Sequence, residues 1–178
     1  MTESTETRNK RAGRTIDMSS TDTIATTASD PTAVVATAQF LTPVVLGLQG
    51  LTINAKQAHW HVRGSNFVGV HELLDTIAGN AGEFADAAAE RIVALGLPLD
   101  ARVSAVAEKS SGTSVPAGFA NSDDLVHAVI ADIDRLLADV RAAVDGLDGI
   151  DLTSQDVAIE IQRGLDKDRW FLVSHIAA

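Results

Sequence analysis

The chain of 178 residues is long enough to bury a sizeable core and fits a single domain. It contains no cysteine, which excludes disulfides, thiolate zinc sites and thiol chemistry, and its net charge of −10 argues against indiscriminate nucleic-acid binding by the body of the protein. No apolar run reaches membrane-spanning length and no apolar segment opens the chain, so we expect a soluble protein with no signal peptide and no membrane partner.

Residues 1–30 are rich in Ser and Thr and contain no Leu, Val or Phe, so they cannot bury a helix or strand of their own. We expect a flexible tail here and one folded domain over residues 31–178. The basic residues of the tail could contact DNA phosphates, or the tail could be an ordinary solvated arm. Its five acidic residues favour the solvated arm slightly. The cations concerned are Arg8, Lys10, Arg11 and Arg14.

The first predicted helix follows a short apolar segment, residues 32–41, that is ambiguous between an extended segment and a helical turn. Thr42 followed by Pro43 is typical of an N-cap and the first helical position, which predicts a helix from there to about Val62. A second helix is predicted over residues 66–95, where apolar residues recur at helical spacing.

Residues 97–121 form a long connection, and residues 102–109 within it are expected to form a short helix. A third helix is predicted from about Ser122 to the Asp145–Gly146 pair, and Thr153 with Asp156 resembles a capping box at the start of a fourth. The fold class is therefore all-α: a four-helix bundle with a short helix in the long connection between helices two and three.

Four metal-capable side chains share one stripe of the second predicted helix. His71 and Asp75 are four residues apart, as are Asp86 and Glu90. The eleven residues from Asp75 to Asp86 return to nearly the same face at about 100° per residue. The two pairs lie roughly 16 Å apart along the axis, so one metal ion cannot use both pairs of a single chain.

Gly79 and Gly82 lie on the same stripe between the two pairs, although a glycine inside a helix costs about 1 kcal/mol relative to alanine. Close approach of a second backbone explains both. Two antiparallel copies that cross at the glycines would bring His71 and Asp75 of one chain opposite Asp86 and Glu90 of the other. We therefore expect a two-fold dimer with two identical shared sites.

His59, beside the apolar stripe of the first helix, supplies a fifth donor. Two imidazoles and three carboxylates suit Fe(II), Mn(II) or Zn(II). Each residue alone is more often a solvated carboxylate or a satisfied core histidine, but together on one face they favour a metal site. A di-metal centre inside one bundle would need Glu-x-x-His pairs, which the sequence lacks, and helices three and four show no matching inward carboxylates.

Other histidines and tryptophans receive ordinary roles. His61 lies about 200° round the helix from His59 and is expected at the surface or behind the site. Trp60 and Trp170 are expected in the core or an interface, although Trp60, beside a metal-binding histidine, could also donate an electron to a stray oxidant. His127 and His175 are expected to be structural.

The sequence resembles a known family of ferritin-like miniferritins, Dps, whose name stands for DNA-binding protein from starved cells. The resemblance covers roughly residues 42–178. It rests on KQAHWHVRG (Lys56–Gly64), Phe67, VHELLD (Val70–Asp75), DAAAERIVALG (Asp86–Gly96) and LDKDRWFLVSH (Leu165–His175).

The resemblance implies a dodecameric shell of dimers in the cytoplasm that oxidises Fe(II), preferably with hydrogen peroxide, and stores the ferric product. It implies no organic cofactor. Iron would be bound at each dimer interface by one subunit's His59, His71 and Asp75 and by the partner's copies of Asp86 and Glu90. Asp75 would bind the metal directly or orient another ligand.

The resemblance also assigns residues around the iron site and on the shell. Lys56 would place a positive charge near the site or pair with a carboxylate, with Trp60 also behind the ligands. Asp151 and Asp156 correspond loosely to acidic pore positions that admit cations. Ordinary helix caps and a solvated loop are the alternative for these two aspartates.

Two other functions stay open. Many relatives bind DNA through a basic tail, but here only the mixed-charge N-terminal tail is available, so DNA binding and association with the nucleoid are expected to be weak and salt-sensitive. A DNA-compacting protein with secondary iron chemistry is one alternative. A metal-dependent hydrolase is the other, because histidine and carboxylate ligands at a two-metal site can also activate water.

Overall fold

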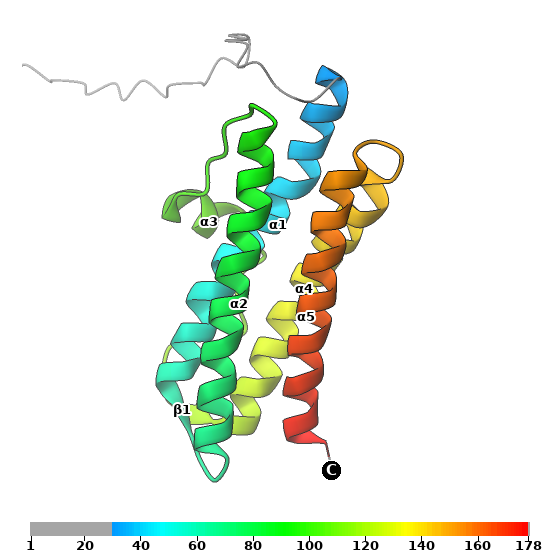
Figure 1. Cartoon of the computed structure of the whole chain (residues 1–178). Coiled ribbons are helices and arrows are strands. Elements are labelled where there is room, and N and C mark those ends of the chain that lie inside the picture. The colour runs from blue at the N-terminus through cyan, green and yellow to red at the C-terminus, as the bar shows by residue number, and fades with distance from the viewer. Residues whose placement is uncertain (1–29, 178) are drawn as a thin grey trace, which may run out of the picture.

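Four long helices run side by side along one direction, and they form two pairs that pack face to face (Figure 1). In this computed structural model, which describes residues 30–177, the first pair is α1 (Pro31–His61) with α2 (Phe67–Ala94). The second pair is α4 (Ser122–Leu147) with α5 (Leu152–Ile176). The predicted all-α bundle is confirmed. The predicted tail and its four cations lie outside the described residues.

The core lies between the two pairs. The apolar residues that recur at helical spacing on α2 are buried, among them Leu74, Ile77 and Ile92. On α4 the same holds for Leu125 and Ile133. Helical spacing of apolar residues therefore predicted correctly which face of each helix is buried.

Helix α1 begins twelve residues earlier than predicted, at Pro31 instead of Pro43. Asp30 caps it by accepting a hydrogen bond from the backbone N–H of Thr32 at 2.9 Å. Pro43 lies inside the helix, where it removes one backbone donor. The prediction of an N-cap at Thr42 was wrong because burial of apolar residues on both sides of Pro43, such as Leu41 and Val44, outweighs the local helix-breaking tendency.

The turn between α4 and α5 also differs from the prediction. Helix α4 continues to Leu147, and the cap of α5 is Asp151, not the Thr153 and Asp156 pair. The Asp151 carboxylate accepts hydrogen bonds from the backbone N–H groups of Thr153 and Ser154. It also pairs with the Arg91 guanidinium at 2.7 Å, a contact between distant parts of the chain that local sequence cannot reveal.

The long connection between α2 and α4 contains the predicted short helix, α3 (Val103–Lys109), which packs against α1. Near its end, β2 (Ala120–Asn121) pairs in parallel with β1 (Val62–Arg63), two residues each, and so ties the end of α1 to the start of α4. The buried carboxylate of Asp132 on α4 accepts a hydrogen bond from the backbone N–H of Ser114 at 2.7 Å and holds the connection down.

Helix α1 is long and apolar enough, by length and composition alone, to cross a membrane. We expected no apolar run of that length, because polar residues such as Gln39 and Gln49 interrupt the apolar residues of this helix. Its mean hydropathy is nevertheless 1.5. The helix packs against α2 and α4 and supplies core residues such as Leu48. Its apolar character is thus used within the bundle.

Candidate metal centre

His59 and His71 form a stacked pair where the end of α1 lies against the first turns of α2. Their ring centroids are 3.7 Å apart and their planes differ by 20°. Phe67, at the start of α2, stacks on the other side of His71 with a centroid separation of 5.0 Å. Residues twelve apart in sequence thus become direct neighbours because the chain reverses between the two helices.

Each imidazole is oriented by the backbone of the other histidine. Nδ1 of His59 lies 2.8 Å from the carbonyl oxygen of His71, and Nδ1 of His71 lies 2.9 Å from the carbonyl oxygen of His59. A carbonyl can only accept, so each Nδ1 carries the proton and donates it. The carbonyl of His59 is free to accept because it belongs to the last turn of α1.

This reciprocal bonding has a chemical consequence. With Nδ1 protonated in the neutral ring, Nε2 keeps its lone pair and is the atom that can bind a metal ion. Metal-binding histidines commonly have their other nitrogen bonded to a carbonyl in this way. The two predicted imidazole ligands are therefore held in the tautomer that metal binding requires.

Asp75 lies one turn after His71 on α2, and its carboxylate accepts a hydrogen bond from the ammonium group of Lys56 on α1. This hydrogen bond lowers the pKa of the Asp75 carboxyl below its usual value of 3.8. The carboxylate is thus kept ionised beside the two histidines. Lys56 pairs with a carboxylate, which is one of the two roles expected for it.

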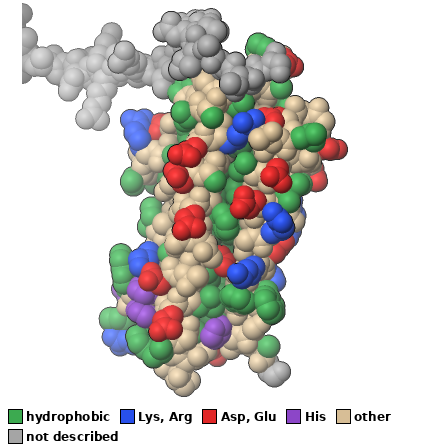
Figure 2. Space-filling view, viewed as in Figure 1, with side chains coloured by type: hydrophobic (Ala, Val, Ile, Leu, Met, Phe, Trp, Pro, Cys, Tyr) green, Lys and Arg blue, Asp and Glu red, His purple; other side chains and the backbone are tan. Residues whose placement is uncertain are grey.

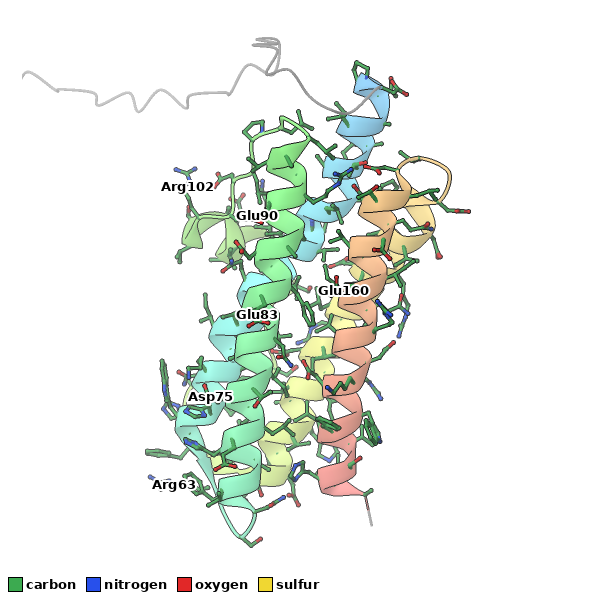
Figure 3. The ribbon with its side chains drawn as sticks, in the orientation of Figure 1. Arg63, Asp75, Glu83, Glu90, Arg102 and Glu160 are labelled. Atoms are coloured by element: carbon green, nitrogen blue, oxygen red, sulfur yellow. The ribbon has the colours of Figure 1, made fainter. Side chains whose placement is uncertain are left out.

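Asp86 and Glu90 lie on the same exposed side of α2, farther along the helix. Figure 3 shows the separation, with Asp75 near one end of α2 and Glu90 near the other. Within residues 30–177 of one chain, no three His, Asp or Glu side chains come together to hold a metal ion. His59, His71 and Asp75, predicted to act from one chain, are therefore not brought together as a three-ligand group, and the division of the five ligands between two chains stays a prediction.

The surface between the two halves is open. Acidic side chains are spread along the visible face of α2, and histidines gather toward one end of the molecule (Figure 2). A Cβ atom added to Gly79 or Gly82 would meet no atom within 4 Å. Nothing within residues 30–177 requires glycine there, which leaves room for the close backbone approach that we expect from a second copy.

His61, Trp60 and Trp170 do not belong to the stacked pair. Nδ1 of His61 donates to the Gln57 carbonyl at 2.8 Å, and its ring contacts Phe119 with centroids 5.3 Å apart, so His61 does not join the pair. Trp60 and Trp170 are each 63% exposed, so neither is a core residue of the single chain.

Sequence reasoning missed two buried carboxylates. Asp132 binds the long connection, and Asp168 on α5 is 2% exposed and accepts hydrogen bonds from the Asn80 amide at 2.9 and 3.1 Å. Burial raises the pKa of Asp168, although the Asn80 hydrogen bond opposes the shift. Both aspartates fall beside apolar positions of helices that also carry exposed acids, so helical spacing alone gives no signal for them.

The two predicted pore residues differ in their surroundings. The carboxylate of Asp151 is occupied by the cap of α5 and by Arg91, whereas Asp156 is exposed one turn later. His175 lies near the start of α2, where its Nδ1 is 2.9 Å from the side-chain amide nitrogen of Asn66. This contact agrees with the structural role expected for His175.

Comparison with known proteins places the chain in a family. A ferritin-like domain matches residues 50–178. The DNA protection during starvation protein of Agrobacterium fabrum is 34% identical over 127 residues, which cover 71% of this chain and 78% of the relative.

Solved structures of Dps proteins are also similar to this chain. A structure of Dps from Microbacterium arborescens in the high iron form is 62% identical, covers 85% of this chain and 99% of that chain, and has a TM-score of 0.83. A tetragonal form of Mycobacterium smegmatis Dps is 26% identical, covers 83% of this chain and 90% of that chain, and has a TM-score of 0.78. The bundle, the arrangement of α1 and α2 and these likenesses together show that the chain belongs to the Dps family of ferritin-like proteins.

Proposed function

We propose that this protein is a ferroxidase that oxidises Fe(II) at centres shared between two chains and stores the ferric product in a hollow shell. Membership in the Dps family supports a role in iron storage or in DNA protection. The observation that supports the ferroxidase centre most directly is the pair of reciprocal hydrogen bonds between His59 and His71. Both rings keep Nε2 available for a metal ion, and Asp75, Asp86 and Glu90 are exposed on α2.

The donor set fits the proposed substrate. Fe(II) accepts both imidazole nitrogen and carboxylate oxygen, and the carboxylates offset the extra positive charge of Fe(III). With hydrogen peroxide as oxidant, two Fe(II) ions each give up one electron, the O–O bond breaks, and both oxygens leave as water after taking up two protons. The reaction consumes peroxide and Fe(II), the pair that would otherwise generate hydroxyl radicals.

Each residue has a physical role in this proposal. His59 and His71 bind iron through Nε2, while Asp86 and Glu90 of the partner chain neutralise and bridge it. Asp75 binds iron directly or orients another ligand. The acidic outer surface attracts Fe(II) toward the protein, and Asp156 lies at the surface on the expected route of cation uptake.

The assembly follows from the incompleteness of one chain. Two copies of α2 that cross in antiparallel orientation at Gly79 and Gly82 would complete two equivalent centres. Six such dimers would form the dodecameric shell that resemblance to the Dps family implies, and the shell would act in the cytoplasm. Iron is the substrate and stored product, and no organic cofactor is needed.

Anaerobic loading with Fe(II), followed by hydrogen peroxide and a reading of ferric absorbance, tests the proposal. We expect rapid oxidation by the natural chain and loss of at least about tenfold in rate when Asp86→Ala and Glu90→Ala are combined. Glu160→Ala, an exposed carboxylate on α5, is the matched control and should oxidise normally. No oxidation by the natural chain, or no loss in the double variant, would disprove the ferroxidase.

A second candidate function is DNA protection, which several relatives carry in their names; we consider protection by direct binding to DNA. Binding would have to use the N-terminal tail, since the folded body is acidic. A gel shift at several salt concentrations, with the full chain and with a chain lacking residues 1–17, separates the two. We expect weak, salt-sensitive binding, and tight binding at physiological salt that depends on the tail would favour direct DNA protection.

A further inference from the structure

Two Asp–Gly dipeptides lie three residues apart where α4 ends, and the sequence has no other Asp–Gly pair and no Asn–Gly pair. Asp145 and Gly146 belong to α4, whereas Asp148 and Gly149 lie in the turn that leads to α5. This turn lies at one end of the bundle (Figure 1). Each dipeptide has a branched apolar residue before it and another after it, so a difference in their reactivity has to come from the fold.

A glycine after an aspartic acid permits a reaction between the backbone and the side chain. The glycine nitrogen attacks the side-chain carbonyl carbon, its hydrogen and the carboxyl hydroxyl leave as water, and a five-membered succinimide ring forms. Water then opens the ring at either carbonyl. Opening at the main-chain carbonyl leaves isoaspartate, in which the chain continues through the side-chain carbon, and the net reaction consumes neither an oxidant nor a cofactor.

The backbone at Asp148 and Gly149 forms a type II turn. Asp148 has φ −59° and ψ 124°, Gly149 has φ 72°, and the N–H of Ile150 donates to the Leu147 carbonyl at 3.0 Å. The third position of such a turn needs a positive φ, which favours glycine. The turn therefore places a residue without a side chain directly after Asp148, where a larger residue would hinder the attack.

The peptide nitrogen of Gly149 is available for the attack. Within residues 30–177 its N–H donates no hydrogen bond, and the Asp148 carboxylate takes part in none of the ion pairs. Both residues are exposed. Type I and type II turns differ by a rotation of this central peptide, so the nitrogen can turn toward the side chain while the bond that closes the turn stays in place.

The dipeptide inside α4 lacks this freedom. The N–H of Gly146 belongs to the regular hydrogen bonding of the helix. A Cβ atom at Gly146 would lie 2.2 Å from Cζ of Phe40, so α1 packs directly against this part of α4. The nitrogen of Gly146 can therefore reach the carboxyl of Asp145 only after the end of α4 unwinds and separates from α1.

We propose that Asp148 is a site of spontaneous isoaspartate formation in the folded protein, and that the helix protects Asp145. Isoaspartate adds one carbon to the backbone between residues 148 and 149. The N–H groups of Ile150 and Asp151 now donate to the Leu147 carbonyl at 3.0 and 3.2 Å, and a longer backbone cannot keep both bonds. Because Asp151 caps α5, the modification loosens the start of that helix. The inference does not depend on the proposed ferroxidase centre.

Ageing of the full-length protein in warm, mildly acidic buffer, with circular dichroism to confirm that it stays folded, tests the proposal. Mass spectrometry of its peptides identifies isoaspartate by its fragment ions. The same chain unfolded in urea is the reference, and both samples are kept until the unfolded chain contains isoaspartate at both positions. We expect similar rates at Asp145 and Asp148 in the unfolded chain, and a rate at Asp148 at least about tenfold higher than at Asp145 in the folded protein.

Two matched variants identify the source of the isoaspartate. Asp148→Glu keeps the negative charge but would need a six-membered ring, so it should remove most of the product, whereas Asp145→Glu should leave the amount unchanged. Equal rates at the two positions of the folded protein, or a reaction at Asp148 in the unfolded chain alone, would overturn the proposal.

Hydrogen exchange of the aged protein tests the effect on α5. Exchange at the backbone N–H groups of Thr153 and Ser154, which donate to the Asp151 carboxylate, should be faster than in fresh protein. Unchanged exchange in a sample that contains isoaspartate at position 148 would overturn the loosening of the helix.

Discussion

Asp168 shows how a single buried residue affects the stability of the protein. Its carboxylate is almost inaccessible to water and has the Asn80 amide as its hydrogen-bond partner. Burial raises its pKa, so the folded protein holds this proton to a higher pH than the unfolded chain does. Between the two pKa values the unfolded state binds fewer protons, and the free energy of unfolding therefore falls as the pH rises.

Asp168→Asn should remove this penalty, because an amide has the same shape, carries no charge and can still accept from Asn80. We expect the variant to have a higher thermal midpoint than the natural protein at pH 7, and the difference to shrink as the pH falls toward 4. Thermal unfolding followed by circular dichroism across this range measures it. A variant that is less stable than the natural protein at pH 7 would show that the ionised carboxylate contributes favourably.

The candidate ligands show how much the spacing of single residues reveals by itself. His71, Asp75, Asp86 and Glu90 were identified because helical spacing places them on one stripe, and α2 has that geometry. The reciprocal hydrogen bonds of His59 and His71 were not predictable, since they depend on how α1 and α2 meet. The same limit applied to Asp168, whose burial is determined by a partner 88 residues away.

At the scale of helices, α2 and α5 are held close by an aromatic ring that lies over a glycine. A Cβ atom at Gly164 of α5 would lie 2.1 Å from Cζ of Phe84 on α2, so only glycine fits beneath the ring. Gly164→Ala would force Phe84 or a helix to move, although alanine is the better helix former. We expect it to lower the stability by about 1–3 kcal/mol.

The thermal midpoint of Gly164→Ala should accordingly fall by roughly 2–4 °C for each kcal/mol lost. Gly118→Ala is the matched control, because no atom lies within 4 Å of a Cβ there. If the two variants unfold at the same temperature, the packing of Phe84 on Gly164 does not limit the separation of the helices.

Helix positions were predictable from sequence where apolar spacing decides them, and helix ends were not. Helix α4 begins at the predicted Ser122, and α3 lies where a short helix was expected. The start of α1 was missed because Thr42 and Pro43 carry a strong local signal that packing overrides. The cap of α5 was missed because Asp151 is held partly by Arg91, which comes from another helix.

At the scale of the whole molecule, the glycines of α2 allow assembly to be separated from folding. No atom of the described part of the chain lies within 4 Å of a Cβ at Gly79, so Gly79→Leu should keep the bundle folded and its helix content unchanged. The leucine side chain should instead hold two crossing copies of α2 apart. We expect the natural protein to form large assemblies of dimers in solution and the variant to be mainly a single chain.

Light scattering for mass and circular dichroism for helix content test this prediction. Ala142→Leu places the same side chain on the exposed face of α4 and should leave the assembly intact. A Gly79→Leu protein with the natural mass would show that the chains do not meet at these glycines. Natural protein that never exceeds two chains would argue against the shell.

The division of the ligands between two chains can be tested directly by mixing defective chains. One variant combines His59→Ala with His71→Ala, and the other combines Asp86→Ala with Glu90→Ala. Neither alone should oxidise Fe(II) faster than background. In a mixed dimer, one of the two centres receives both histidines from one chain and both acids from the other, whereas the second centre receives neither set.

Random association of equal amounts makes about half of the dimers mixed, so about a quarter of the natural centres should be regained after unfolding and refolding together. The measurement is the rate of ferric absorbance per chain, with each variant refolded alone as the control. A centre built within one chain would stay inactive in every mixture, because no chain would carry a full set. Recovery of activity therefore requires the interface that the spacing of α2 predicts, in which each chain supplies the half that the other lacks.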